Sequence, residues 1–115
     1  MDSLMVSTSK LIPYRKYLNR FRLKRVIAAR PTEPPRVVHW AGYFLVINGT
    51  HRTYARIAAG ERELEIYNLG SARSMRERQV FTRAISEGRL GPKAFLALRI
   101  YSRYWTNQQL ELELP

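Results

Sequence analysis

The sequence predicts a small α/β domain, because strand-like and helix-like patterns alternate through its middle third. Residues 36–40 and 43–47 flank a two-residue turn signal, Ala-Gly, which is typical of a β-hairpin. Residues 52–59 place their apolar side chains on one helical face, and residues 64–67 alternate as a short strand does. A length of 115 residues fits one domain with its own core.

The second strand of the hairpin is expected to be central in its sheet. The run Phe44-Leu45-Val46-Ile47 is apolar at every position, which is typical of a strand covered on both faces. Gly60 is a natural end for the helix that follows, because glycine readily takes the left-handed conformation found after helices. The middle of the chain therefore reads as hairpin, tight loop, helix and strand.

The N-terminal part gives a weaker pattern. Residues 1–12 are predicted to be flexible, since Met1–Ser9 is mostly small and polar, and the folded domain is predicted over residues 13–115. Pro13 is suited to open a helix whose apolar positions would be Tyr14, Tyr17, Leu18 and Phe21. The apolar positions then shift, so the sequence leaves open whether that helix ends near Arg22 or rolls onto a new face.

The C-terminal part is predicted to be helical over residues 74–105. Ser74-Met75-Arg76-Glu77 has the spacing of a capping box, and Gly88 would end the helix it starts. Gly91-Pro92 would start a second helix with an apolar stripe at Ala94, Ala97, Leu98, Tyr101 and Trp105. Leu110–Leu114 alternates cleanly and is predicted as an edge strand.

Charge is the strongest compositional feature. The formal net charge is +11, and residues 10–30 carry eight basic side chains and no acidic one. Such one-sided charge predicts a polyanionic partner, DNA or RNA. The predicted contacts are Arg15, Lys16, Arg20, Arg22, Lys24 and Arg25, interleaved with aromatic residues. An equally weighted alternative has the aromatic residues packing inward and the cations merely solvated.

Several classes of site are excluded or disfavoured by residue usage. The chain has no cysteine, so disulfides, thiolate metal sites and cysteine nucleophiles are excluded. Asp2 is the only aspartate, so the paired-aspartate metal site of many nucleases is missing, and no metal site is predicted. No apolar run is long enough for a membrane helix and no secretory signal is visible, so we expect a cytoplasmic protein without membrane contact.

The strand-to-helix connection Asn48-Gly49-Thr50-His51-Arg52 is the main candidate site. Gly49 permits a positive φ angle and close approach of a ligand to the backbone. The first turn of the helix offers unpaired N–H groups and the positive end of the helix dipole. Thr50, His51 and Arg52 add side-chain donors. The plainer interpretation is an ordinary connection in which Thr50 only caps the helix.

The same residues carry a resemblance to a known superfamily. Val46–Ala55 resembles the signature of the ParB/sulfiredoxin superfamily, in which an apolar strand runs into Gly-x-His-Arg or Gly-x-Arg-Arg and then an alanine-rich helix. The preceding prolines, the helix, Gly60 and the next strand follow in the same order. The resemblance covers residues 30–68, about a third of the chain.

The resemblance implies a small mixed sheet with flanking helices and a loop that holds nucleotide phosphates, of ATP or CTP, with Mg²⁺ as a further option. Gly49, Thr50, His51 and Arg52 would contact the phosphates. Sulfiredoxins carry their reactive cysteine where this chain has Thr50, so sulfinic-acid reduction is excluded. Full ParB proteins continue into a helix-turn-helix domain, for which no recognition helix is evident here.

The leading hypothesis is a ParB-like domain that binds a nucleotide, CTP or ATP, and acts on or with nucleic acid through its basic surface. The alternatives are a ParB-like nuclease and a non-enzymatic DNA-binding accessory protein whose nucleotide site has decayed; a small-molecule kinase is more distant. Glu33 and His51 are the candidate catalytic residues, as acid or base. Enzyme activity, as a triphosphatase or nuclease, and the oligomeric state, including a homodimer, stay open.

Overall fold

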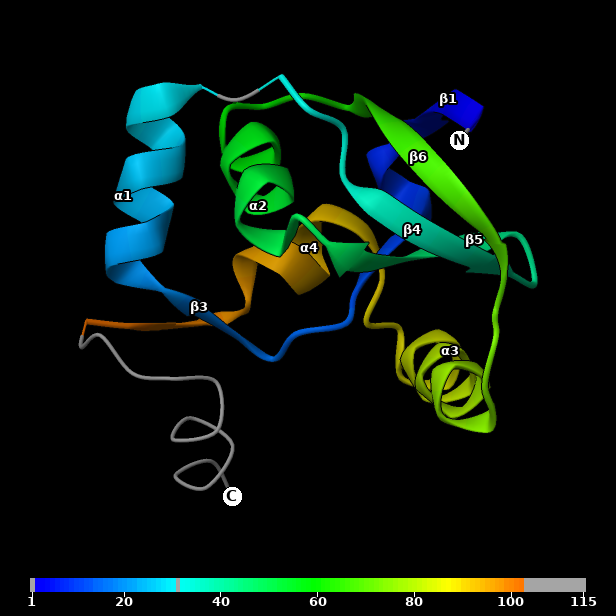
Figure 1. The fold of residues 1–115 in the computed structure, drawn as a ribbon. Coiled ribbons are helices and arrows are strands. Elements are labelled where there is room, and N and C mark those ends of the chain that lie inside the picture. Colours follow the sequence, from blue (N-terminus) through cyan, green and yellow to red (C-terminus); the bar gives the residue numbers. More distant parts are fainter. Residues whose placement is uncertain (1, 31, 103–115) are drawn as a thin grey trace.

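The protein folds around a five-stranded mixed sheet in a computed structural model, which describes residues 2–30 and 32–102 (Figure 1). In spatial order its strands are β1 (Asp2–Ser7), β6 (Glu63–Ser71), β4 (Arg36–Trp40), β5 (Tyr43–Asn48) and β2 (Leu11–Pro13). The β1–β6 and β4–β5 pairs are antiparallel, while β6–β4 and β5–β2 are parallel. The predicted fold class, a small mixed sheet with flanking helices, is confirmed.

The predicted hairpin is present as β4 and β5. Its two turn residues, Ala41 and Gly42, have φ angles of 55° and 83°, and a two-residue turn with both φ positive matches the twist of the strands it joins. The second strand is internal, as expected, because β5 pairs with β4 on one side and β2 on the other. Leu45 and Val46 are fully buried on opposite faces of the sheet.

Helices cover both faces of the sheet. Val46 packs in a cluster with Ile57 of α2 (Thr50–Ala58) and Phe95 of α4 (Gly91–Leu96). Leu45 packs in the opposite cluster with Phe81 of α3 (Met75–Glu87). In Figure 1, α2 and α4 lie together, α3 lies apart from them, and α1 (Arg20–Ala29) stands beside α2. The two helical layers bury the apolar run of β5 from both sides.

The prediction of a flexible N-terminus is wrong for the described residues. The strand β1 pairs with β6 along its whole length, from Asp2 opposite Asn68 to Ser7 opposite Glu63. A 3₁₀ turn, η1 (Thr8–Lys10), then leads into β2. The sequence pattern did not predict this strand because, among residues 3–7, Val6 alone is buried in the core. Hydrogen bonds to β6, which no local pattern displays, hold the segment.

The prediction of a helix that begins at Pro13 is also wrong. Both predicted continuations, an end near Arg22 and a roll onto a new face, are therefore wrong as well. Pro13 ends β2, and residues 17–19 form the short strand β3 (Tyr17–Asn19), which buries Tyr17 and Leu18 next to each other. The helix α1 begins only at Arg20, because the side-chain oxygen of Asn19 accepts the N–H of Arg22 at 3.1 Å and caps it. The apparent helical spacing arose from adjacent strand residues.

The C-terminal prediction is confirmed for α3 and wrong after α4. The Ser74 hydroxyl accepts the N–H of Glu77 at 3.1 Å, and Gly88 ends the helix in the left-handed conformation. The second helix stops at Leu96, and residues 99–101 instead form β7 (Arg99–Tyr101), parallel to β3. Trp105 and the strand predicted at 110–114 lie outside the described residues.

Candidate functional site

The loop between β5 and α2 has the backbone shape that the sequence predicted. Gly49 has a φ angle of 100° and precedes the first helical residue. A Cβ at this position would lie 3.0 Å from Cβ of Pro35 and 3.1 Å from its Cα. Nη2 of Arg52 is nearer, at 2.7 Å, but it ends a flexible side chain that can move, whereas the Pro35 ring is rigid. Glycine is therefore required here for both its φ angle and its small size.

Thr50 begins α2 and presents an unusual hydroxyl. The residue is 2% exposed, yet Oγ1 has no hydrogen-bond partner among the described residues. No side chain caps the helix, since the N-cap residue is Gly49. By contrast, the Thr53 hydroxyl donates to the Gly49 carbonyl at 2.8 Å. A buried hydroxyl without a partner costs about 1–3 kcal/mol, so this hydroxyl is an unusual feature of the loop.

A cleft of about 490 Å³ opens beside this loop. Its lining includes all five predicted phosphate contacts, residues 48–52, and Glu33. Three further arginines also line it: Arg15, Arg22 and Arg36. We call it the Gly49 cleft. Together with Arg52, four arginines face one glutamate among the described lining residues, and the field in the cleft favours an anion.

The structure brings the two candidate residues Arg52 and Glu33 together. Nη1 of Arg52 donates to Oε2 of Glu33 at 3.2 Å, and the side chains are 17% and 58% exposed respectively. The ion pair lies at the rim of the cleft, since Glu33 is largely in solvent. An exposed pair of this kind contributes about 0–1 kcal/mol. An arriving phosphate could therefore replace the Glu33 carboxylate as the partner of Arg52 at small cost.

His51 makes a structural contact that the sequence did not predict. It is 7% exposed, and its Nε2 accepts the backbone N–H of Asn19 at 2.9 Å. Burial, followed by the charges of Arg22 and Arg15, lowers the pKa of His51 to about 4. The ring is therefore neutral near pH 7, with its proton on Nδ1. Nε2 is occupied and cannot take a proton from a substrate in this arrangement; Nδ1–H is the remaining donor.

The predicted nucleic-acid contacts separate into two groups. Arg15 and Arg22 line the Gly49 cleft, while the others are exposed on α1 or on the segment before β3: Lys16, Arg20, Lys24 and Arg25. Sequence reasoning missed Arg36, which faces Asn48 across the hairpin. The two-residue turn could have revealed it, because a hairpin of known turn length places the start of β4 beside the end of β5.

The described residues contain neither a cluster suited to a metal ion nor a helix suited to a membrane. Within 2–30 and 32–102, no three histidine, aspartate or glutamate side chains gather closely enough to hold a metal ion. In the same ranges, no helix has the length and apolar character needed to cross a membrane.

Solved structures share this fold at low sequence identity. No protein-family model matches the chain, and no curated protein matches it in sequence. SbnI from Staphylococcus aureus, with a C-terminal truncation, gives a TM-score of 0.53 at 19% identity over 58% of this chain and 30% of that one. A conserved hypothetical protein from Pyrococcus furiosus gives 0.50 at 14%, covering 61% and 33%. Protein Atu1540 from Agrobacterium tumefaciens gives 0.57 at 10%, covering 78% and 50%.

These likenesses concern the fold alone. The chain spans half or less of the length of each of these three proteins. They support the small mixed sheet with flanking helices that the sequence predicts, and they assign the chain to no family. A shared fold does not determine a shared function.

Replacing Gly49 by alanine should destabilise the protein more than replacing Gly60. The φ angle is 100° at Gly49 and 91° at Gly60, so both are in the left-handed region. A Cβ at Gly60 would have nothing within 4 Å, whereas a Cβ at Gly49 would meet Pro35. Backbone strain costs each variant about 1–3 kcal/mol, and the overlap adds about 1 kcal/mol or more to Gly49→Ala. Urea unfolding of both variants measures the difference; equal losses would contradict the close approach.

His51 should make stability depend on pH. The unfolded chain binds a proton near pH 6.5, but the folded chain binds it only near pH 4, so stability is full above about pH 6.5 and falls as the pH is lowered through this window. Between about pH 7 and 5 the loss should be roughly 2 kcal/mol. His51→Gln keeps an acceptor for the Asn19 N–H and should remove this dependence.

The control is His39→Gln, which leaves His51 in place and should keep the wild-type slope. Denaturant unfolding at several pH values gives the comparison. An unchanged slope in His51→Gln would show that this ring does not govern the titration.

Proposed function

We propose that the Gly49 cleft binds the phosphate groups of a nucleoside triphosphate and that the domain acts with nucleic acid through its basic surface. One observation carries the proposal: the buried Thr50 hydroxyl, without a partner among the described residues, at the start of α2 and in the wall of an arginine-lined cleft. A phosphate oxygen is the acceptor that this hydroxyl lacks.

The backbone supports the same ligand. The α2 N-terminus carries unpaired N–H groups and a partial positive charge, which together attract a phosphate. Arg52 would contact the anion directly, since its guanidinium already lies over Gly49, 2.7 Å from where a Cβ would be. Arg22 and Arg36 would neutralise further oxygens from the other walls of the cleft. These contacts match the roles that the superfamily resemblance implies for this loop.

The size of the cleft suits a nucleotide. Its volume of about 490 Å³ falls within the roughly 300–1,000 Å³ typical of small-molecule sites. The resemblance suggests CTP or ATP as the ligand. Mg²⁺ usually binds one or two carboxylates together with substrate phosphates, and Glu33 is the carboxylate in position to take part. In that case Glu33 would bind the Mg²⁺ ion, and Arg52 would pair with the phosphates instead of with Glu33.

The nuclease alternative uses the same cleft for a phosphodiester. It needs a group that activates water, and with Nε2 of His51 already bonded, Glu33 is the acid in the described lining that could do so. Glu33 is paired with Arg52, so this role also requires the carboxylate to leave the ion pair. Incubation with plasmid DNA and Mg²⁺ or Mn²⁺ distinguishes the two, since a nucleotide-binding domain leaves the DNA intact.

Thr50→Val should lower triphosphate affinity without lowering the stability of the protein. Valine keeps the shape but removes the hydroxyl that has no partner, so the free energy of unfolding should stay equal or rise by about 1 kcal/mol, while triphosphate affinity falls. The matched variant Thr53→Val removes a hydroxyl that donates to the Gly49 carbonyl and should lose about 1 kcal/mol of stability. A Thr50→Val protein that is less stable but binds normally would refute the ligand role of this hydroxyl.

Arg52→Ala should weaken triphosphate binding, because the variant loses a guanidinium beside the phosphates. Calorimetric titration of CTP, ATP and GTP with Mg²⁺ against the wild type should show one preferred nucleotide, with affinity reduced about 10-fold or more in the variant. Arg56→Ala is the control, because Arg56 lies one turn further along α2 and pairs with Glu61 instead. If no triphosphate binds the wild type, the nucleotide proposal fails and the phosphodiester alternatives remain.

A further inference from the structure

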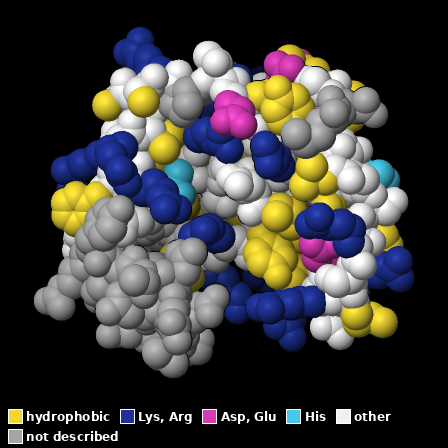
Figure 2. All heavy atoms as spheres, viewed as in Figure 1, with side chains coloured by type: hydrophobic (Ala, Val, Ile, Leu, Met, Phe, Trp, Pro, Cys, Tyr) yellow, Lys and Arg dark blue, Asp and Glu magenta, His cyan; other side chains and the backbone are white. Residues whose placement is uncertain are grey.

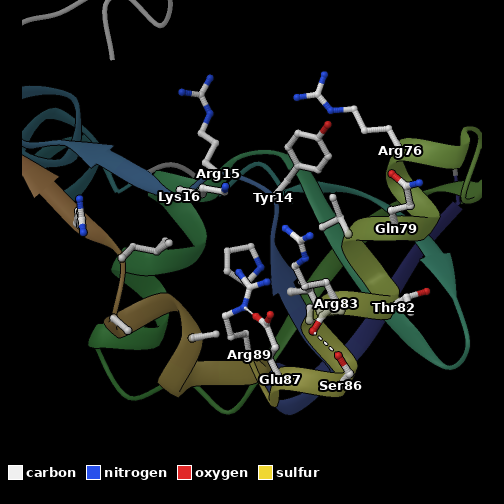
Figure 3. Close-up of a pocket in the computed structure, with 18 residues that line it drawn as sticks. Tyr14, Arg15, Lys16, Arg76, Gln79, Thr82, Arg83, Ser86, Glu87 and Arg89 are labelled. Atoms are coloured by element: carbon white, nitrogen blue, oxygen red, sulfur yellow. Dashed lines mark hydrogen bonds and ion pairs between the residues drawn. The ribbon is translucent and has the colours of Figure 1, made fainter. Parts of the chain in front are cut away.

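A second and larger cavity lies at the β2 edge of the sheet. It measures about 940 Å³ and is bordered by the segment after β2, by α3 and by the end of α4. The edge strand β2 is only three residues long, so the helical layers extend past it and leave a groove between them. We call it the α3 groove; Figure 3 shows its walls.

The walls of the α3 groove are strongly basic. Six cationic side chains line it: Arg15, Lys16, Arg76, Arg83, Arg89 and Arg99. Among the described lining residues the acidic one is Glu87, which already pairs with Arg89 at 2.7 Å. Figure 2 shows Lys and Arg spread over one face of the molecule, with acidic side chains in small separate spots. Like charges gathered in one groove repel one another, and a bound polyanion relieves that repulsion.

The arrangement of the cations favours an extended ligand. Arg76 and Arg83 lie two helical turns apart on α3, about 10 Å along the helix, and Figure 3 shows Arg83 and Arg89 on one wall with Tyr14 and Arg15 on the other. A single phosphate could not reach both ends of such a groove. A flexible strand carries a phosphate at every nucleotide, so its backbone could contact both walls.

The polar lining favours backbone contacts over base reading. The Thr82 hydroxyl donates to the Arg78 carbonyl at 2.9 Å, and the Ser86 hydroxyl donates to the Arg83 carbonyl at 3.1 Å. Both protons are therefore used within the helix. The half-buried ring of Tyr14 supplies an aromatic face of the kind on which bases stack without sequence preference.

We propose that the α3 groove binds the sugar-phosphate backbone of single-stranded nucleic acid. The proposal deepens the nucleic-acid part of the proposed function and rests on it, and it assigns the contact to α3 rather than to α1. A concave groove between two helices admits a flexible single strand more deeply than a rigid duplex. Arg15 lines both the α3 groove and the Gly49 cleft, so the bound strand would pass beside the triphosphate site.

The test compares three double variants that each remove two positive charges. Arg76→Gln/Arg83→Gln alters the α3 groove, Arg20→Gln/Lys24→Gln alters α1, and Arg62→Gln/Arg78→Gln is the control, with exposed residues that do not line the groove. Fluorescence anisotropy with labelled oligothymidylate measures affinity from about 50 to 200 mM salt. Circular dichroism melting confirms that each variant is folded.

The groove variant should bind about 10-fold more weakly than the control, and its salt slope should fall by about 1.4, because each lost single-strand phosphate contact removes about 0.7. A duplex of equal length should bind the wild type more weakly than the single strand. Equal affinities of the groove and control variants, or a larger loss in the α1 variant, would overturn the assignment to α3.

The outcome also separates this proposal from the proposed function. A wild-type protein that binds no oligonucleotide defeats the groove and the nucleic-acid part together, whatever the triphosphate titrations show. Thr50→Val should leave oligonucleotide affinity at the wild-type value, since Thr50 lines only the Gly49 cleft of the two cavities. If Thr50→Val lost as much oligonucleotide affinity as the groove variant, the strand would enter the Gly49 cleft and the assignment to the α3 groove would be overturned.

Discussion

The hydrogen bond from the Asn19 backbone N–H to Nε2 of His51 ties the segment before α1 to the loop that lines the Gly49 cleft. Asn19 caps α1 with its side chain, and His51 lies in the first turn of α2. The bond therefore joins the N-terminal ends of two helices. It also fixes the end of the segment that carries Arg15, and Arg15 lines both cavities. The bond needs an unprotonated Nε2, so the buried, neutral state of His51 is part of the architecture.

The Gly49 cleft combines several features that a purely structural loop would avoid. The backbone takes a left-handed conformation against Pro35, the Thr50 hydroxyl is buried without a described partner, and four arginines face one glutamate. Each feature has a free-energy cost within the protein itself. Costs of this kind gather at functional sites, where a ligand supplies the missing interactions.

The fold positions these residues, but it does not determine which ligand they bind. The hairpin β4–β5 brings Arg36 and Glu33 near the end of β5, and the crossing of the chain over the β2 edge brings the basic segment beside α3. Distant structural relatives share this frame at identities of 19% or less. At such low identity a shared fold does not determine function, which depends on the side chains that line the two cavities.

The sequence by itself determined the central motif: the hairpin, the glycine-opened loop, the helix α2 and the cap of α3. These features depend on neighbouring residues, such as the turn at Ala41 and the Ser74 hydroxyl bonded to the N–H of Glu77. Local chemistry fixes them, and local chemistry is visible in a sequence. The predicted preference of residues 48–52 for an anion likewise depends on local features, namely the glycine turn and the helix N-terminus that follows it.

Only the tertiary structure decided what depends on distant partners. The strand β1 exists because β6 lies beside it, β3 because β7 pairs with it, and the bonding of His51 Nε2 depends on an amide 32 residues away. The α3 groove likewise gathers cations from segments separated by as many as 84 positions, from Arg15 to Arg99. Such long-range contacts leave no periodic trace in the chain, because each is defined by two segments folded together rather than by either alone.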